Sequence, residues 1–158
     1  MKGKPQVVQM LNEVLVAELT AVNQYFLGAK MVAHRGYERL GHKLHTESLE
    51  EMKHAEKLID RILFLDGVPN VQKLEKVTVA ASPVEQLEAD LEIETRSVGH
   101  LNRGIELCRA RGDHGSAELL QGLLPAAESH VEWLETQLEL AKALGVEQYL
   151  AQQVKKDG

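Results

Sequence analysis

The stretch EEMKHAE, residues 50–56, places a glutamate and a histidine three positions apart within a run that has the apolar spacing of a helix. Side chains at i and i+3 project about 60° apart around an α-helix, so Glu51 and His54 share one face and can grip the same ion. The apolar positions Leu58 and Ile62 fall on that face as well. A charged pair on an apolar stripe requires a partner, and a metal ion is one such partner.

The same spacing of acid and histidine positions occurs twice along the chain. In the first half, Glu51 comes 33 residues after Glu18, and His54 comes three residues after Glu51. In the second half, position 127 comes 33 residues after Glu94, and His130 comes three residues after position 127. The second copy carries alanine where the first carries glutamate. The six positions are Glu18, Glu51 and His54 in the first half, and Glu94, Ala127 and His130 in the second.

This pattern is typical of di-iron carboxylate bundles, in which two helices each supply a glutamate and two others each supply a Glu-x-x-His motif. Two neighbouring iron ions need bridging carboxylates to offset their mutual repulsion, and each needs an imidazole and an open coordination position. An isolated acid or histidine on a helix is more often a solvated or satisfied residue. Five matches at fixed spacing favour a metal site, formed by Glu18, Glu51, His54, Glu94 and His130.

Position 127 departs from the pattern, because alanine offers no ligand atom. The neighbouring Glu128 lies about 160° around the helix from His130, on a solvated stripe of acids, and is not expected to replace it. Pro125 removes a backbone donor within the helix and is expected to cost about 3 kcal/mol or to kink it. Three carboxylates facing two Fe(II) ions leave one positive charge uncompensated. We therefore expect one occupied position, at Glu18, Glu51 and His54, and slow iron oxidation.

The rest of the chain predicts an all-α fold. Leucine, alanine, glutamate and lysine are abundant, whereas β-branched runs are scarce. The SPVE sequence at Ser82 is a capping box with proline at the first helical position. About 16 residues separate Gly67 from Ser82, enough to travel the length of a helix. We expect one domain over 1–158, a four-helix bundle with a long crossover between the second and third helices, with helices at about 5–34, 38–65, 83–111, 115–144 and a short fifth at 146–154.

The net charge, the lack of long apolar runs and the cysteine count exclude several classes of function. The formal net charge of −6 argues against binding nucleic acid through a general basic surface. No run of about 18 apolar residues occurs and the first residues lack a signal-peptide pattern, so we expect a cytoplasmic protein without a membrane span. Cys108 is the single cysteine, which excludes rubredoxin-type and zinc-ribbon sites.

Met52 follows Glu51 directly and lies about 160° from His54, so it is expected to point out of the bundle. An outward methionine is either a gap-filler at a packing interface or a thioether ligand. In the second interpretation, a twofold interface would bring two copies of Met52 to opposite sides of one haem iron.

The whole chain resembles the bacterioferritins. The resemblance rests on LNEVLVAELTAVNQYF, ESLEEMKHAEKLIDRILFLDGVPN, DLEIE and HVEWLETQLELAKALGVEQYL. It implies a hollow shell of about 24 subunits that stores oxidised iron and binds haem b between twofold-related subunits through Met52. It also implies that the ferroxidase ligands fall on the six positions above, that Tyr25 lies beside them, and that a ferredoxin supplies electrons for iron release.

Some bacterioferritins combine a subunit competent in iron oxidation with one that binds haem and is defective at the di-iron centre. This chain resembles the second type, since Ala127 replaces an acid and Thr46 stands where many members have a histidine. The first hypothesis is thus a storage-shell subunit with impaired ferroxidase activity by itself. The alternative is a fully active di-iron ferroxidase despite Ala127. The excess of acidic over basic residues argues against a third interpretation, a small ferritin-like protein that binds DNA.

Overall fold

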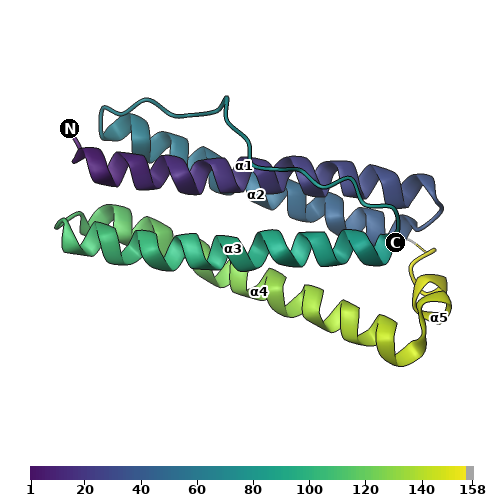
Figure 1. Cartoon of the computed structure of the whole chain (residues 1–158). Helices are drawn as coiled ribbons and strands as arrows, with labels where there is room; N and C mark the ends of the chain where they lie inside the picture. Colours follow the sequence, from purple (N-terminus) through teal and green to yellow (C-terminus); the bar gives the residue numbers. More distant parts are fainter. Residues whose placement is uncertain (156–158) are drawn as a thin grey trace.

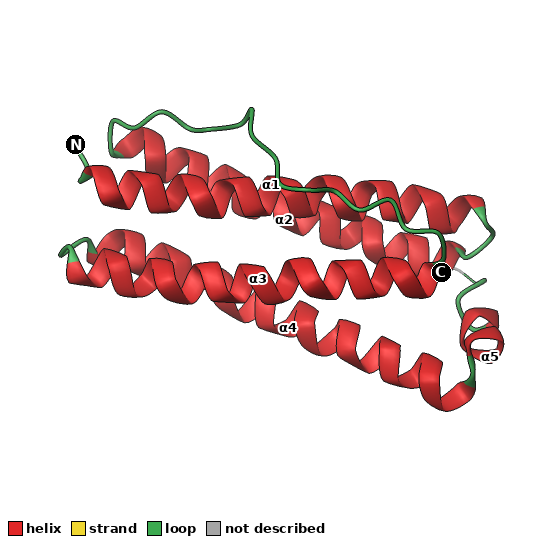
Figure 2. Ribbon diagram, in the orientation of Figure 1, coloured by secondary structure: helices red, strands yellow, loops and turns green. Residues whose placement is uncertain are grey.

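A computed structural model of the chain describes residues 1–155, all in helices, turns and loops without a strand (Figures 1 and 2). The all-α four-helix bundle with a short fifth helix is confirmed. Residues 156–158, which the expected domain includes, lie outside the described part. The helices are α1 (Pro5–His34), α2 (Glu38–Phe64), α3 (Pro83–Ala110), α4 (His114–Leu144) and α5 (Val146–Ala151).

The helices are arranged as two antiparallel hairpins, α1 with α2 and α3 with α4, joined by a crossover that makes α2 and α3 parallel (Figure 1). The crossover runs the length of the bundle and is fastened to α1 through polar side chains. The backbone N–H of Thr78 donates to Gln24 Oε1 at 2.8 Å, and the N–H of Glu75 donates to Thr20 Oγ1 at 2.9 Å. These bonds satisfy backbone groups in a segment that has no partner strand or helix.

Local capping sets where two of the helices begin. Ser82 accepts a hydrogen bond from the N–H of Glu85, and the Glu85 carboxylate accepts from the N–H of Ala81, one residue earlier than in an ideal capping box. Asp113 caps α4 by accepting from the N–H of Ser116, so α4 begins one residue before its predicted start.

The charged interior lies between two apolar regions. One region occupies the end of the bundle near the N-terminus and includes Leu11, Leu58 and Leu120. The other occupies the opposite end and includes Tyr25 and Leu44. Each fully buried side chain of this size contributes about 1.5–3 kcal/mol, so the two ends stabilise a bundle whose middle is polar.

Helix α4 passes through Pro125 as one continuous helix from His114 to Leu144, and Pro125 itself is exposed. Toward its C-terminal end, α4 slopes away from α3 (Figure 1). Tyr149 of α5 donates from its hydroxyl to Gln137 Oε1 at 2.7 Å, which holds the short helix against α4. None of the helices within residues 1–155 combines the length and the apolar composition that crossing a membrane requires.

Candidate metal centre

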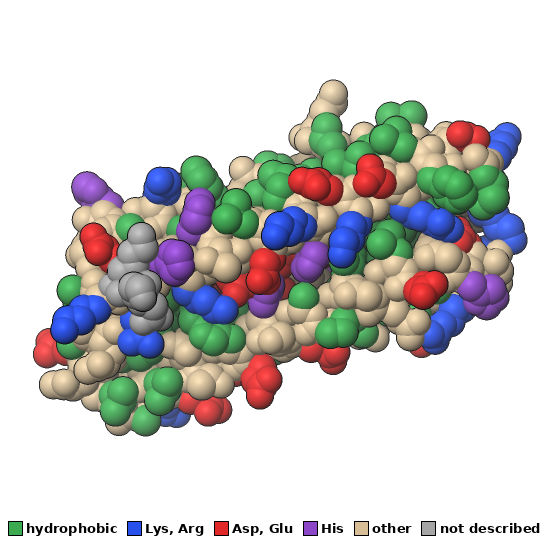
Figure 3. Space-filling model, turned by 180° about the vertical axis from the view of Figure 1, so that it is seen from behind, with side chains coloured by type: hydrophobic (Ala, Val, Ile, Leu, Met, Phe, Trp, Pro, Cys, Tyr) green, Lys and Arg blue, Asp and Glu red, His purple; other side chains and the backbone are tan. Residues whose placement is uncertain are grey.

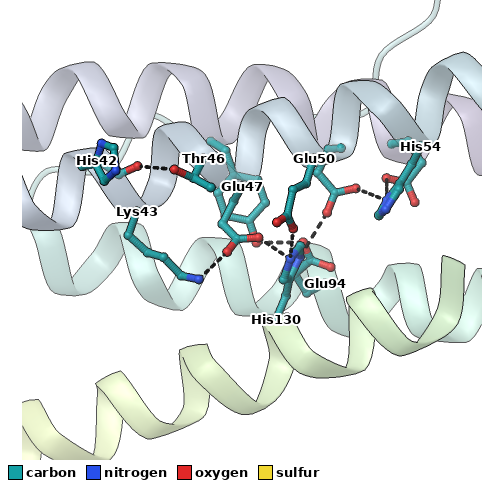
Figure 4. Close-up of polar contacts among 11 residues, drawn as sticks. His42, Lys43, Thr46, Glu47, Glu50, His54, Glu94 and His130 are labelled. Atoms are coloured by element: carbon teal, nitrogen blue, oxygen red, sulfur yellow. Dashed lines mark hydrogen bonds and ion pairs between the residues drawn. The ribbon is translucent and has the colours of Figure 1, made fainter. Parts of the chain in front are cut away.

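Four helices deliver acids and histidines to one polar centre in the bundle (Figure 4). The side chains are buried because their positions belong to the inward stripe of each helix. Burial of a carboxylate is unfavourable unless a cation or a hydrogen-bond donor faces it. The exposed fractions are 3% for Glu18 of α1, 3% for Glu51 of α2, 1% for Glu94 of α3 and 6% for His130 of α4, and His54 of α2 is partly buried.

Glu18, Glu51 and His54 form the first ligand set. His54 Nδ1 lies 3.3 Å from Glu51 Oε2 and 3.7 Å from Glu18 Oε2. One ligand atom from each residue falls within 4.8 Å of the others, as coordination of a single ion requires. Glu18 Oε2 is buried without a hydrogen-bond partner, so an open acceptor faces the set.

Glu51, Glu94 and His130 form the second set, whose ligand atoms also lie within 4.8 Å of one another. His130 Nδ1 is 3.1 Å from Glu51 Oε1 and 3.1 Å from Glu94 Oε1. Glu51 belongs to both sets, one oxygen toward each histidine. A carboxylate in that position is able to bridge two neighbouring ions.

Protonation of histidines and glutamates reduces the net negative charge of the metal-free centre. Burial would lower the pKa of each histidine, but hydrogen bonds to the carboxylates outweigh it and raise the pKa to about 10 for His54 and about 12 for His130. Burial raises the pKa of Glu94 to about 7, and burial together with the nearby Glu51 raises the pKa of Glu18. Because an imidazolium has no lone pair for a metal, binding must release protons.

Tyr25 touches the second set through its hydroxyl, which donates to Glu94 Oε1 at 2.7 Å. The ring is 1% exposed and meets the His130 ring edge-on at 6.4 Å between centroids. Burial and the nearby carboxylates of Glu94 and Asp90 raise the pKa of Tyr25 well above its usual value. The phenol therefore stays protonated and orients the Glu94 carboxylate.

Ala127 lies on the inward face of α4, 5% exposed and packed in the apolar region at the N-terminal end. Its methyl group supplies no ligand, and Glu128 is exposed on the other side of the helix. The acid missing from the repeat is thus not replaced from α4.

Two acids of α2 that sequence reasoning did not assign to the centre approach His130 instead. His130 Nε2 lies 3.2 Å from Glu50 Oε2 and forms an ion pair with Glu47 Oε2. The predicted set of three carboxylates does not include these two acids. The sequence did indicate that Glu47 faces inward, because it precedes Glu51 by four residues and lies on the same helical stripe.

Met52 does not join the centre. Its side chain is 43% exposed on the outer face of α2, as its helical angle predicts. Phe26 of α1 and Leu49 of α2 are also exposed, at 49% and 53%. These three residues are exposed apolar side chains of the α1–α2 hairpin and are here called the outer apolar patch.

Comparisons with known proteins agree with this architecture. The model of the ferritin-like domain family matches residues 8–144. The chain is 48% identical to a bacterioferritin of Streptomyces coelicolor over 96% of this chain and 90% of that protein. It is 46% identical to a bacterioferritin of Mycobacterium leprae, covering 99% of this chain and 98% of the relative. A bacterioferritin of Brucella melitensis is 43% identical over 94% of this chain and 92% of its own length. The chain belongs to the bacterioferritin family of ferritin-like proteins.

Proposed function

We propose that this chain is a subunit of an iron-storage shell, which takes Fe(II) into the polar centre and keeps it as an Fe(III) mineral. The observation that carries this function is the pair of carboxylate–histidine sets that share Glu51. Carboxylate oxygens and imidazole nitrogens together suit iron ions, and family membership supports the same cargo. The net charge of −6 suits a protein that attracts cations and avoids nucleic acid.

Oxidation in such a centre moves electrons from iron to dioxygen. Two Fe(II) ions lose one electron each, and dioxygen accepts these two electrons and two protons to leave as hydrogen peroxide. Efficient transfer needs both ions close together, which depends on enough negative charge between them. Because Ala127 adds no carboxylate to the second set, we propose that the homo-oligomer oxidises iron slowly and relies on a co-assembled, competent subunit. The alternative is a fully active ferroxidase, in which Glu47 or Glu50 compensates for Ala127.

The assembly we propose is a closed shell of about 24 copies, alone or mixed with the second subunit type, in the cytoplasm. Each copy would act as one ferritin-like domain. Release of stored iron requires an electron donor, and a ferredoxin is the class that the family resemblance suggests. Membership in the bacterioferritin family supports this assembly.

Purified homo-oligomer loaded with Fe(II) in air is expected to retain iron in a shell-sized particle after desalting. An anaerobic Fe(II) titration is expected to give one tight ion per chain, followed by slow oxidation when air is admitted. Two tight ions with a rapid burst of ferric absorbance would favour the fully active alternative. Iron that precipitates outside the particle would contradict storage.

We further propose that the outer apolar patch holds haem b between two subunits, with one Met52 from each as axial ligand. The fit is supported by the exposed thioether of Met52 and by the exposed apolar side chains of Leu49, three residues earlier on α2, and of Phe26 on α1. Haem bound there would supply a one-electron carrier next to the bundle. Met52 would fix the iron, and the apolar side chains would exclude water from the porphyrin faces.

Replacing Met52 with leucine is expected to abolish the Soret band of shells reconstituted with haemin, because leucine keeps the volume of the side chain and removes the sulfur. Met31→Leu, at a partly buried position of α1, is the matched control and should retain haem. An unchanged low-spin spectrum in Met52→Leu would contradict the assignment of the axial ligand.

A further inference from the structure

A cavity of about 550 Å³ lies at the end of the bundle that carries the short helix α5. Side chains of α2, of α4 and of the segment around α5 line it, and it is here called the α5 cavity. It lies where α4 slopes away from α3 and α5 follows at the end of α4 (Figure 1). None of its lining residues belongs to the two ligand sets of the metal centre. Its volume is in the range of cavities that hold small organic molecules.

The wall that α2 contributes is basic. Arg39, His42 and Lys43 are spaced at i, i+3 and i+4, so they share one face of the helix, and all three line the cavity. Among residues 1–155, no aspartate or glutamate lines it. In Figure 3, basic and apolar side chains lie beside one another toward the end that carries α5. A positive cavity in a chain with a net charge of −6 favours an anionic ligand.

The donors on this wall differ in how much of their charge remains for a ligand. Lys43 Nζ is paired with Glu47 Oε1 at 2.7 Å, which offsets part of its charge (Figure 4). Arg39 Nη1 donates to a backbone carbonyl just after α5 at 3.5 Å, and a guanidinium has five N–H donors, so this contact does not preclude one with an anion. Gln137 Oε1 accepts from the Tyr149 hydroxyl at 2.7 Å, so its amide can still donate. Arg39 is therefore the main anchor for a negative charge.

The wall that α4 contributes is apolar. Trp133, Leu140 and Leu144 line the cavity, and the two leucines are 42% and 52% exposed. Lys43 Nζ lies 5.1 Å from the centroid of the Trp133 ring, so the indole extends the basic wall into the apolar one. A small inorganic anion would leave the leucines in contact with water. A molecule with an apolar body would cover them.

We propose that the α5 cavity binds an organic anion, one molecule per chain, with its carboxylate, sulfonate or phosphate group on Arg39 and its apolar body against Trp133 and Leu140. The opposition of a basic wall and an apolar wall across one cavity carries this inference. Both halves of the ligand are needed, because the charge is recognised by α2 and the apolar body by α4. The site does not depend on iron chemistry, since it shares no residue with the metal centre.

The probe we choose is 4-iodobenzoate, because its iodine atom quenches indole fluorescence at close range and gives an anomalous diffraction signal. Trp133 is the single tryptophan of the chain, so its emission reports this cavity alone. In haem-free homo-oligomer we expect saturable quenching with one probe per chain, and in soaked crystals an anomalous peak between Arg39 and Trp133. The neutral analogue 4-iodobenzamide has nearly the same shape and should bind about 10-fold more weakly or less, because it lacks the charge.

The substitution Arg39→Gln is expected to weaken 4-iodobenzoate binding by about 10-fold and to leave 4-iodobenzamide binding unchanged. Arg35→Gln is the matched control, because Arg35 is an exposed arginine that does not line the cavity. An empty cavity in the soaked crystals, equal affinities of acid and amide, or an unchanged affinity in Arg39→Gln would each overturn the inference. The first two results come from the unaltered chain, so they hold even if Arg39→Gln loosens α5. None of them bears on iron storage.

Discussion

Substitution of Ala127 with glutamate is expected to increase the rate of Fe(II) oxidation by the homo-oligomer by about 10- to 100-fold. The position is inward-facing and precedes His130 by three residues on α4, so a glutamate there would lie on the same helical face as His130. The new carboxylate would offset the repulsion between two ions and draw His130 to coordinate through Nδ1. Stopped-flow absorbance of the ferric product measures the rate.

The same substitution should have the opposite effect on the metal-free protein. Ala127 is 5% exposed, so a glutamate there adds a buried charge to a centre that already contains Glu18, Glu51 and Glu94. We expect a lower melting temperature without metal and a recovery when Co(II) is added, because the ion replaces the missing positive charge. Ser129→Glu, which adds the same charge at an exposed position of α4, should change neither the rate nor the melting temperature much. An unchanged rate in Ala127→Glu would contradict the charge argument.

The helices were predictable because their signals are local. Ser82, Pro83 and Glu85 mark the start of α3, and α3 begins at Pro83. The end of α5 was predicted less well: the short fifth helix was expected to reach about residue 154, whereas it ends at Ala151. A short helix has few hydrogen bonds to hold its last turn, and its end depends on packing that sequence periodicity does not describe.

The sequence predicted only those residues of the centre that belong to its internal repeat. The spacing of Glu18, Glu51, His54, Glu94 and His130 predicted that they would face inward, and the structure brings all five together. The contacts of Glu47 and Glu50 with His130 depend instead on the relative height of α2 and α4, which side-chain packing sets. Helical angle predicts the face on which a residue lies but not the residue that it meets across the bundle.

Replacing His130 with alanine is expected to lower the free energy of unfolding of the metal-free protein by about 3–5 kcal/mol, because it leaves buried carboxylates without their cation. His130 is 6% exposed and faces Glu51 and Glu94 through one nitrogen and Glu47 through the other. Chemical denaturation of the chelator-treated protein measures the loss. His42→Ala, at an exposed position of α2, is the matched control and should stay within about 0.5 kcal/mol of the parent.

The loss in His130→Ala should shrink as pH rises. In the folded parent, burial would lower the pKa of His130, but hydrogen bonds to Glu47, Glu51 and Glu94 raise it to about 12, above its unfolded value of about 6.5. A group of this kind contributes stability that is fully present below its unfolded pKa and is lost as pH rises toward the folded one. The alanine variant lacks this contribution at every pH. The variant should therefore fall furthest below the parent near pH 6 and come closer to it at pH 8 and above. Equal losses at both pH values would show that His130 acts by packing and not by its charge.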